Sequence, residues 1–201
     1  MKRKGSFLMA LGLLFMAGAV GLTGYNLWEA DRAEELSTQS AVEVQAVIEE
    51  YQESQTVEFE VPDYVLAPEI EMPTVALDGD RYVGLLEIPC LGLNLPVIDD
   101  WSYGALKCAP CRYTGSVYKN DMVIMAHNYR SHFGRLRSVG LGEIVTFTDL
   151  SGNVFNYEAV DIETLQATQI EEMTSGDWDL TLFTCTTSGQ ARVAVRYELI
   201  G

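Results

Sequence analysis

The feature that most restricts the fold of this chain is an uncharged stretch close to its N-terminus. Residues 5–28 contain no Asp, Glu, Lys or Arg, and the first acid is Glu29. About 20 apolar residues are enough for a helix to cross the hydrocarbon core of a bilayer. A helix buried in a soluble core would show a polar face, and no such face interrupts this stretch. The sequence therefore predicts a membrane span, which we assign to residues 7–28.

Charged residues on the two sides of the stretch predict its orientation. Residues 2–4 are Lys-Arg-Lys, whereas acids follow the stretch at Glu29, Asp31, Glu34 and Glu35. Positive charge marks the cytoplasmic side of a span, and the aromatic pair Tyr25 and Trp28 suits the outer interface. A cleaved signal peptide is the alternative interpretation, because Ala17-Gly18-Ala19 has the small residues of a cleavage site. The apolar run continues beyond that site, which favours a retained single-pass anchor in the cell membrane. Both interpretations put the remaining chain on the extracellular side.

The overall composition excludes two classes of protein. The formal net charge of the 201-residue chain is −16, whereas nucleic-acid binding requires clusters of Lys and Arg. We therefore expect no nucleic acid among its partners. Hydrophobic residues make up 48% of the chain, which is enough to fill a core and excludes global disorder.

The pattern of residues divides the chain into three parts. Residues 1–28 form a cytoplasmic tip and the transmembrane anchor, residues 29–79 a helical stalk and a linker, and residues 80–201 a folded domain. Apolar residues recur at helical spacing in the stalk, which predicts a solvated amphipathic helix: Leu36, Val44, Ile48 and Tyr51. The linker contains prolines that suit neither a helix nor a central strand: Pro62, Pro68 and Pro73.

The folded domain shows the patterns of β-strands. Short apolar or alternating runs predict strands at 81–88, 93–98, 121–126, 143–148, 153–163, 179–185 and 191–200. Two turn sequences predict hairpins, Asp149–Gly152 and Thr186–Gly189. Helices are expected only at 102–107 and 133–139. Residues 193–197 alternate as in a half-buried strand. Many short strands with few helices predict a mostly β fold, either a barrel or a sandwich.

Three residue types in this domain suggest nucleophilic chemistry. Cys185 ends an apolar run and precedes a turn, and Arg192 follows on the returning strand of the same hairpin. His127 ends another β-like run. A thiol becomes a useful nucleophile only beside a base or a cation, so these residues together would supply a nucleophile, a proton relay and an oxyanion donor. The alternative is that Cys185 is an inert core thiol.

The run before Cys185 carries a family signature. Residues 181–185, Thr-Leu-Phe-Thr-Cys, match the T-L-x-T-C motif of the sortases at every specified position. Other segments resemble parts of that family and occur in the family's order. Residues 84–89 and 95–97 resemble its opening strands, residues 121–128 resemble the strand that leads to its histidine, and residues 191–196 resemble the strand that carries its arginine. The chain therefore resembles a sortase over roughly residues 81–201.

The resemblance implies a closed β-barrel and the activity of a cysteine transpeptidase. Cys185 would attack the C-terminal sorting signal of a surface protein, of the Leu-Pro-x-Thr-Gly kind, and form a thioester acyl-enzyme. His127 would be the acid and base, Arg192 would stabilise the oxyanion, and Thr184 would contribute to substrate binding. The acceptor would be an amine of a peptidoglycan precursor or of a pilin. We expect no cofactor and no metal.

Some positions depart from the family pattern. Ala126 precedes His127 where most sortases carry Gly, and the pair His127-Asn128 is more similar to class B, so the class stays open. Arg196 is a second candidate for the arginine role, but it lies at the far end of its strand. Two other functions remain as alternatives, one enzymatic and one of binding only. One is an L,D-transpeptidase, whose S-x-G-C-R motif is not matched around Cys185, and the other is a silent membrane-tethered β-domain that binds a surface protein.

The remaining cysteines, the second histidine and a group of acids carry weaker signals. Cys108 and Cys111 form a C-x-x-C pair, for which a local disulfide and inert thiols are both open. Only Cys90 and His132 are left as further ligands, so we predict no zinc site. We expect His132 to be a surface residue. The acids Glu171, Glu172, Asp177 and Asp179 predict a solvated loop rather than a calcium site.

Overall fold

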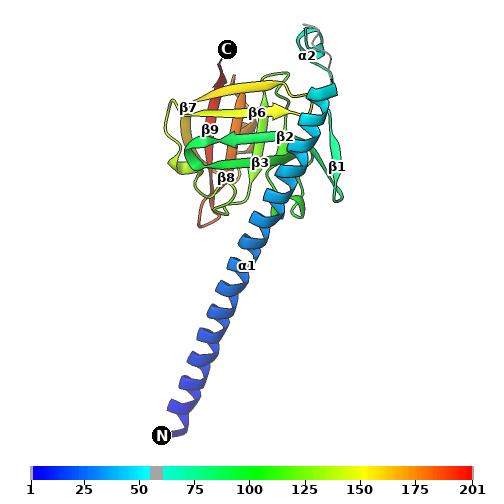
Figure 1. Cartoon of the computed structure of the whole chain (residues 1–201). Helices are drawn as coiled ribbons and strands as arrows, with labels where there is room; N and C mark the ends of the chain where they lie inside the picture. The colour runs from blue at the N-terminus through cyan, green and yellow to red at the C-terminus, as the bar shows by residue number, and fades with distance from the viewer. Residues whose placement is uncertain (1, 55–60, 201) are drawn as a thin grey trace.

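The computed structural model describes residues 2–54 and 61–200 and consists of a long helix and a β-barrel (Figure 1). Helix α1, Lys2–Ser54, is a single uninterrupted helix of 53 residues. Its first part projects away from the barrel and its last part lies along the barrel wall. Residues 8–28 are exposed along their whole length, and α1 is long and apolar enough to cross a membrane.

The second part of α1 packs against the barrel, so the prediction of a solvated stalk is wrong. A stripe of residues three or four positions apart is buried: Ala33, Ser37, Ala41, Val44 and Ile48. Val44 and Ile48 join a cluster that includes Leu85 and Ile98 of the barrel. Tyr51, also expected on the apolar stripe, is exposed. An apolar stripe on a helix is stable only when another surface covers it, and here the outer wall of the barrel is that surface.

The barrel is built from short strands in the described part of the chain. They are β1 (Val75–Leu77), β2 (Asp80–Ile88), β3 (Leu93–Ile98), β4 (Cys111–Thr114), β5 (Met122–Ala126), β6 (Ile144–Asp149), β7 (Val154–Gln166), β8 (Leu180–Cys185) and β9 (Ala191–Leu199). The order in the sheet is β1-β2-β3-β4-β5-β8-β9-β7-β6, and a β2–β6 pairing closes it. The barrel therefore contains the eight strands β2–β9, with β1 added beside β2. The predicted mostly β fold with a closed barrel is confirmed.

Parallel pairings occur at two places, β3–β4 and β5–β8, and the other pairings are antiparallel. Five short helices complete the described chain: α2 (Asp63–Leu66), the 3-10 helices η1 (Pro89–Leu91), η2 (Ala105–Lys107) and η3 (Leu136–Ser138), and α3 (Ile170–Thr174). The two helices predicted at 102–107 and 133–139 are thus single 3-10 turns. The sequence patterns missed β1 and β4, because strands of three or four residues are too short to show an alternation. Strand β2, with which the closed barrel begins, starts at Asp80, and β1 precedes it at Val75–Leu77.

The interior of the barrel is apolar and follows the alternation of the strands. Leu182, Val195 and Tyr197 point inward and join the main core. On the outer face of the same strands, Phe183 and Ala194 are also buried, under Leu165 and Met173. Strand β9 was predicted to be half-buried, but both of its faces are covered. The second face is covered because the segment between β7 and β8 folds over the outside of the sheet.

Candidate active site

Strand register brings His127, Cys185 and Arg192 to the same end of the barrel. In the parallel pair β5–β8, Ala126 lies opposite Thr184, so His127 and Cys185 are the next residues on neighbouring strands. In the antiparallel pair β8–β9, Cys185 lies opposite Arg192. The hydroxyl of Thr184 donates a hydrogen bond of 2.8 Å to the carbonyl of Ala126 and ties the two strand ends together. The side chain of Cys185 lies on the outer face of β8, because residues alternate along a strand.

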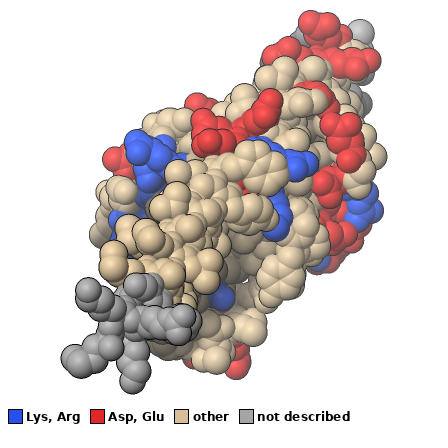
Figure 2. Space-filling model, turned by 90° about the horizontal axis from the view of Figure 1, so that it is seen from below, with Lys and Arg blue, Asp and Glu red and all other residues tan. Residues whose placement is uncertain are grey.

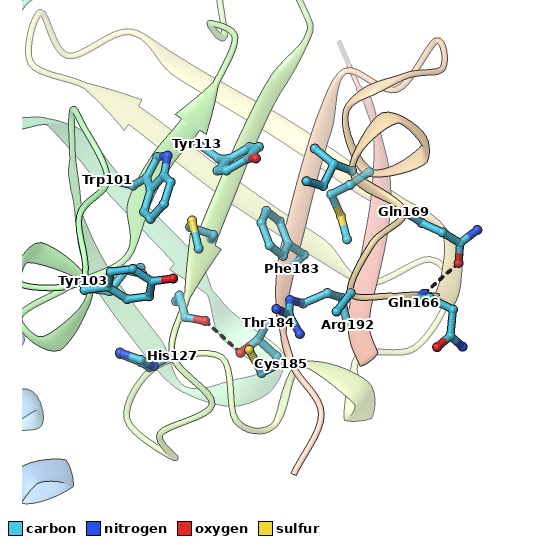
Figure 3. A pocket seen from close by; sticks show the side chains of 16 residues that line it. Trp101, Tyr103, Tyr113, His127, Gln166, Gln169, Phe183, Thr184, Cys185 and Arg192 are labelled. Atoms are coloured by element: carbon cyan, nitrogen blue, oxygen red, sulfur yellow. Dashed lines mark hydrogen bonds between the residues drawn. The ribbon is translucent and has the colours of Figure 1, made fainter. Parts of the chain in front are cut away.

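These three residues line one cleft on the outside of the barrel (Figure 3). The cleft has a volume of about 350 Å³, and its walls include Cys185, His127, Arg192 and Thr184. In the figure, Cys185 lies between His127 and Arg192, and the guanidinium of Arg192 points toward Cys185. The structure thus brings Cys185, His127, Arg192 and Thr184 together, whereas the second candidate arginine, Arg196, does not line the cleft. Thr184 borders the cleft, but its hydroxyl is already bonded to Ala126.

One wall of the cleft is aromatic, which the sequence patterns did not predict. Tyr103, Trp101, Tyr113 and Phe183 form a row, with successive ring centroids 5.8, 5.9 and 5.6 Å apart. Trp101 and Tyr103 come from the loop after β3, and Tyr113 from the missed strand β4. Three aromatic residues within residues 101–113 were the available signal. An apolar wall of this kind suits the side chains of an extended peptide.

The opposite wall comes from the segment between β7 and β8. Gln166, Gln169, Ile170 and Met173 line the cleft there. The backbone N–H of Gln166 donates to the side-chain oxygen of Gln169 at 2.7 Å, which stabilises the turn into α3. A second, more polar hollow adjoins Cys185 and includes Asn128, Arg137 and Ser188. Cys185 is therefore reached from two sides, one apolar and one polar.

The four cysteines, all within the described ranges, are free thiols, and only Cys185 lines the cleft. Burial raises the pKa of the Cys108 thiol, and it raises the pKa of Cys111 to about 12. Such thiols carry little thiolate and react slowly. The sequence left both a local disulfide and inert thiols open for the C-x-x-C pair, and in the structure Cys108 and Cys111 are free thiols. Cys185 itself is half-buried at the mouth of the cleft.

His127 is half-buried beside Tyr129, with ring centroids 4.9 Å apart. Burial lowers the pKa of His127, and the nearby carboxylate of Glu29 on α1 opposes this effect. At neutral pH the imidazole is therefore mainly neutral, which is the form that accepts a proton. Glu29 forms an ion pair of 2.5 Å with Lys107 of η2, so α1 passes close to the cleft.

His132 is fully buried, so its prediction as a surface residue is wrong. The tight turn after β5 carries it inward, because the N–H of Phe133 bonds to the carbonyl of His127 at 3.2 Å and Phe133 enters the core. The carbonyl of Ala33 lies near its ring. Neither ring nitrogen, however, has a hydrogen-bond partner with good geometry among residues 2–54 and 61–200. Burial lowers the pKa of His132 to about 4.

The two candidate arginines have different surroundings. Arg192 is half-buried, and one of its terminal nitrogens donates to the carbonyls of Gly189 and Ala191, both at 3.1 Å. Arg196 is 1% exposed. It donates to the Glu163 carboxylate at 2.7 Å, the Thr181 hydroxyl at 2.9 Å, and the carbonyls of Glu172 and Met173 at 2.7 and 2.8 Å. Arg196 therefore holds α3 against the barrel and does not line the cleft.

A metal centre is not assembled in the described part of the chain, where no three His, Cys, Asp or Glu side chains are grouped suitably. The acids that precede β8 are mostly exposed. Glu172 contributes its backbone carbonyl to Arg196, and Asp179 accepts a hydrogen bond of 2.6 Å from the N–H of Leu199.

Comparisons with known proteins agree on one family. The profile of the sortase domain matches residues 86–200. Among solved structures, the sortase D5 transpeptidase of Clostridium perfringens is 21% identical with a TM-score of 0.58, covering 78% of this chain and 98% of that one. Sortase C-3 of Streptococcus pneumoniae is 23% identical with a TM-score of 0.54, covering 86% of this chain and 88% of that one.

Sortase A of Listeria monocytogenes is 21% identical with a TM-score of 0.54, covering 60% of this chain and 88% of that one. At these identities the structural likeness concerns the fold. No match was found among curated proteins.

Proposed function

Because the chain belongs to the sortase family, we propose that it is a membrane-anchored cysteine transpeptidase with Cys185 as its nucleophile. The observation that carries the proposal is that Cys185, His127 and Arg192 line one cleft. The family match removes the L,D-transpeptidase alternative. The roles below are assigned from the position of each side chain in that cleft.

In the first half-reaction, neutral His127 takes the proton of the Cys185 thiol, and the resulting thiolate attacks a backbone carbonyl carbon of the substrate. The carbonyl oxygen becomes an oxyanion, and the Arg192 guanidinium beside Cys185 stabilises that charge. Hydrogen bonds to Gly189 and Ala191 hold the guanidinium on the hairpin. The C–N bond then breaks, His127 in its protonated form donates a proton to the leaving amine, and a thioester remains on Cys185.

In the second half-reaction, an amine takes the place of the leaving peptide. Neutral His127 removes its proton as the nitrogen attacks the thioester, a new amide forms, and the Cys185 thiolate leaves. No cofactor enters either step. The polar hollow beside Cys185, with Asn128 and Arg137 in its wall, supports a separate entry for the amine. We propose a peptidoglycan precursor or a pilin as its source.

We propose that the substrate is the sorting signal of a surface protein, of the Leu-Pro-x-Thr-Gly kind. A sortase C of Clostridium perfringens, 21% identical with a TM-score of 0.53, has been solved with a C-terminal cell wall sorting motif. The cleft of the present chain is open at its surface and has an apolar wall that includes Trp101, Tyr113 and Phe183. These properties suit an extended peptide with an apolar side chain.

The anchor is also part of the proposal. Residues 7–28 would span the membrane once, with the N-terminal tip in the cytoplasm and the barrel outside. The length and hydropathy of α1 support the span. The basic residues 2–4 and the acids that begin at Glu29 support the orientation.

The test uses the full chain in detergent micelles and a panel of fluorogenic peptides. The peptides carry Leu-Pro-x-Thr-Gly or Asn-Pro-x-Thr-Asn motifs, and each is incubated with and without an added amine. We expect cleavage and amine transfer for one motif class, and neither in Cys185→Ala. No turnover of any peptide, together with a Cys185 thiol that resists alkylation in the folded chain, would instead indicate a silent domain that binds a surface protein.

A further inference from the structure

The helix that would span the membrane is continuous with the helix that packs on the barrel. Residues 25–54 contain neither Gly nor Pro, and α1 runs through them without a break. Ala33 and Val44 are buried against other parts of the chain. Helices bend sharply mainly at Pro, at Gly or at an inserted side chain. The barrel is therefore held at a defined height relative to the apolar part of α1.

That height is small. Glu29, the first residue after the uncharged stretch, forms its ion pair with Lys107 of the barrel at 2.5 Å. The uncharged residues 5–28 make a helix of about 36 Å, which exceeds the hydrocarbon core of about 30 Å but not the full bilayer of about 40–45 Å. Trp28 would then lie among the lipid headgroups, and the end of the barrel that carries Lys107 would begin at the same level.

The loop next to Lys107 has the composition of a membrane-interface segment. Trp101 and Tyr103 are 41% and 79% exposed, although large aromatic side chains are usually covered. Rings with a polar group favour the headgroup layer, where one part is apolar and the other wet. The exposed ring of Tyr103 lies 5.8 Å from Trp101, so the two form one patch.

The charge of this region differs from that of the whole chain. Residues 101–142 contain six of the 13 Lys and Arg residues and one acid, Asp121. Asp121 precedes β5 at the end opposite His127, whereas Arg130 follows Tyr129 and Arg137 lines the hollow beside Cys185. Figure 2, seen from below along the direction in which α1 projects, shows the acids mainly toward the upper right of this face. Lys and Arg side chains near an anionic leaflet are attracted to it.

We propose that the catalytic end of the barrel rests on the outer leaflet of the bilayer, with Trp101 and Tyr103 in the headgroup layer. The cleft then opens at the membrane surface, and Cys185 meets substrates that are presented there. This inference rests on the membrane span of the proposed function. The occupant of the exposed aromatic patch is the lipid surface itself, because Lys107, four residues after Tyr103, is ion-paired with Glu29, which directly follows the uncharged part of α1.

The chain offers a matched set of reporters, since its three tryptophans are Trp28, Trp101 and Trp178. Trp178 precedes β8 at the end of the strand opposite Cys185. Three full-length variants would each keep one Trp, with the other two replaced by Phe. They are reconstituted in phosphatidylcholine–phosphatidylglycerol vesicles with or without bromine on the upper acyl chain. We expect the bromine to quench Trp101 to a similar extent as Trp28, and to leave Trp178 unquenched.

A second variant changes the height of the barrel without changing its surface. An insert of seven residues, Glu-Ala-Lys-Ala-Glu-Ala-Lys, between Trp28 and Glu29 lengthens α1 by about 10 Å and almost two full turns. Quenching of Trp101 should fall to the value of Trp178, whereas quenching of Trp28 should persist. Circular dichroism of each variant checks the fold.

Two results would contradict the inference, one about the position of the barrel and the other about the membrane span. Quenched Trp28 with unquenched Trp101 before the insertion would mean that the span exists and the barrel stands clear of the lipid. Unquenched Trp28 would mean that α1 does not span the bilayer, which overturns the proposed anchor and this inference with it. Peptide cleavage in detergent tests the chemistry independently of both.

Discussion

The two ends of the strand pair β8–β9 carry the same kind of residue in different surroundings. Arg192 lies opposite Cys185 and Arg196 opposite Thr181. They are four residues apart, so both side chains project from the outer face of β9. At the first end the outer face is open and forms the cleft. At the second end, α3 closes over it, Glu163 of the neighbouring strand β7 reaches Arg196, and every part of the Arg196 fork is bonded.

The difference teaches that coverage by another segment decides what a side chain on this sheet can do. A buried guanidinium with a full set of hydrogen bonds is a fixed structural group, because any movement would leave polar groups unpaired. A half-exposed one can turn to a substrate. The histidines repeat the contrast: His127 lies at the cleft, and His132 is enclosed without a hydrogen-bond partner in the described chain.

The largest effect is expected at the open end, from Cys185→Ala. Loss of the nucleophile should lower the rate of amine-dependent peptide cleavage by at least about 10⁴-fold, because covalent catalysis then has no acceptor for the acyl group. The exposed Cys90, which does not line the cleft, is the matched control, and Cys90→Ser should keep full activity. A Cys185→Ala chain that still transfers the peptide would place the nucleophile elsewhere.

The next largest effect is expected on catalytic activity when Arg192, and not Arg196, is replaced. Arg192→Ala should lower kcat/KM by about 10²–10³-fold, the usual cost of losing one oxyanion donor. Its denaturant midpoint should stay close to that of the parent. Arg192→Lys should recover only part of the rate, because an ammonium group lacks the planar fork of donors. Parent-like kinetics in Arg192→Ala would argue that this end of the hairpin does not contact the reacting atoms.

For stability, the same comparison predicts a large effect of replacing Arg196 and a small effect of replacing Arg192. Arg196→Met should lower the free energy of unfolding by about 3 kcal/mol, since it leaves the carboxylate of Glu163 and two carbonyls without their partner. Water offsets part of this loss because the Glu163 side chain is 34% exposed. Urea denaturation of the full chain in detergent measures it, with Arg192→Met as the control at the open end. Equal midpoints for the two variants would remove the proposed distinction.

The smallest effect concerns the enclosed histidine and pH. Its pKa is about 4 in the folded chain and about 6.5 in an unfolded one. The unfolded chain therefore binds the additional proton between these values, and stability must fall as the pH decreases below 6.5. The loss between pH 7 and pH 5 should be about 2 kcal/mol. His132→Phe should abolish this part of the slope in urea titrations, and a slope that persists unchanged would assign it to other groups.

Much of the fold was predictable because its signals are local. The predicted strands at 81–88, 93–98, 121–126, 143–148 and 179–185 correspond to β2, β3, β5, β6 and β8 within one residue at each end. Alternation and turn residues act over a few positions, so they can be read without the rest of the chain. Strands β1 and β4 were missed, and with β4 the aromatic wall that Tyr113 joins.

The sequence by itself determined the family signature at 181–185, the closed β-barrel class and the apolar helix, and it suggested three residues for catalysis. Only the tertiary structure decided that strand ends 58 residues apart, Ala126 and Thr184, are hydrogen-bonded neighbours. It also decided that α1 packs on the barrel and that Arg196 and His132 are enclosed. The reason is that burial of a polar side chain depends on which distant segment closes over it. That choice follows from the packing of the whole chain, and no local pattern of residues encodes it.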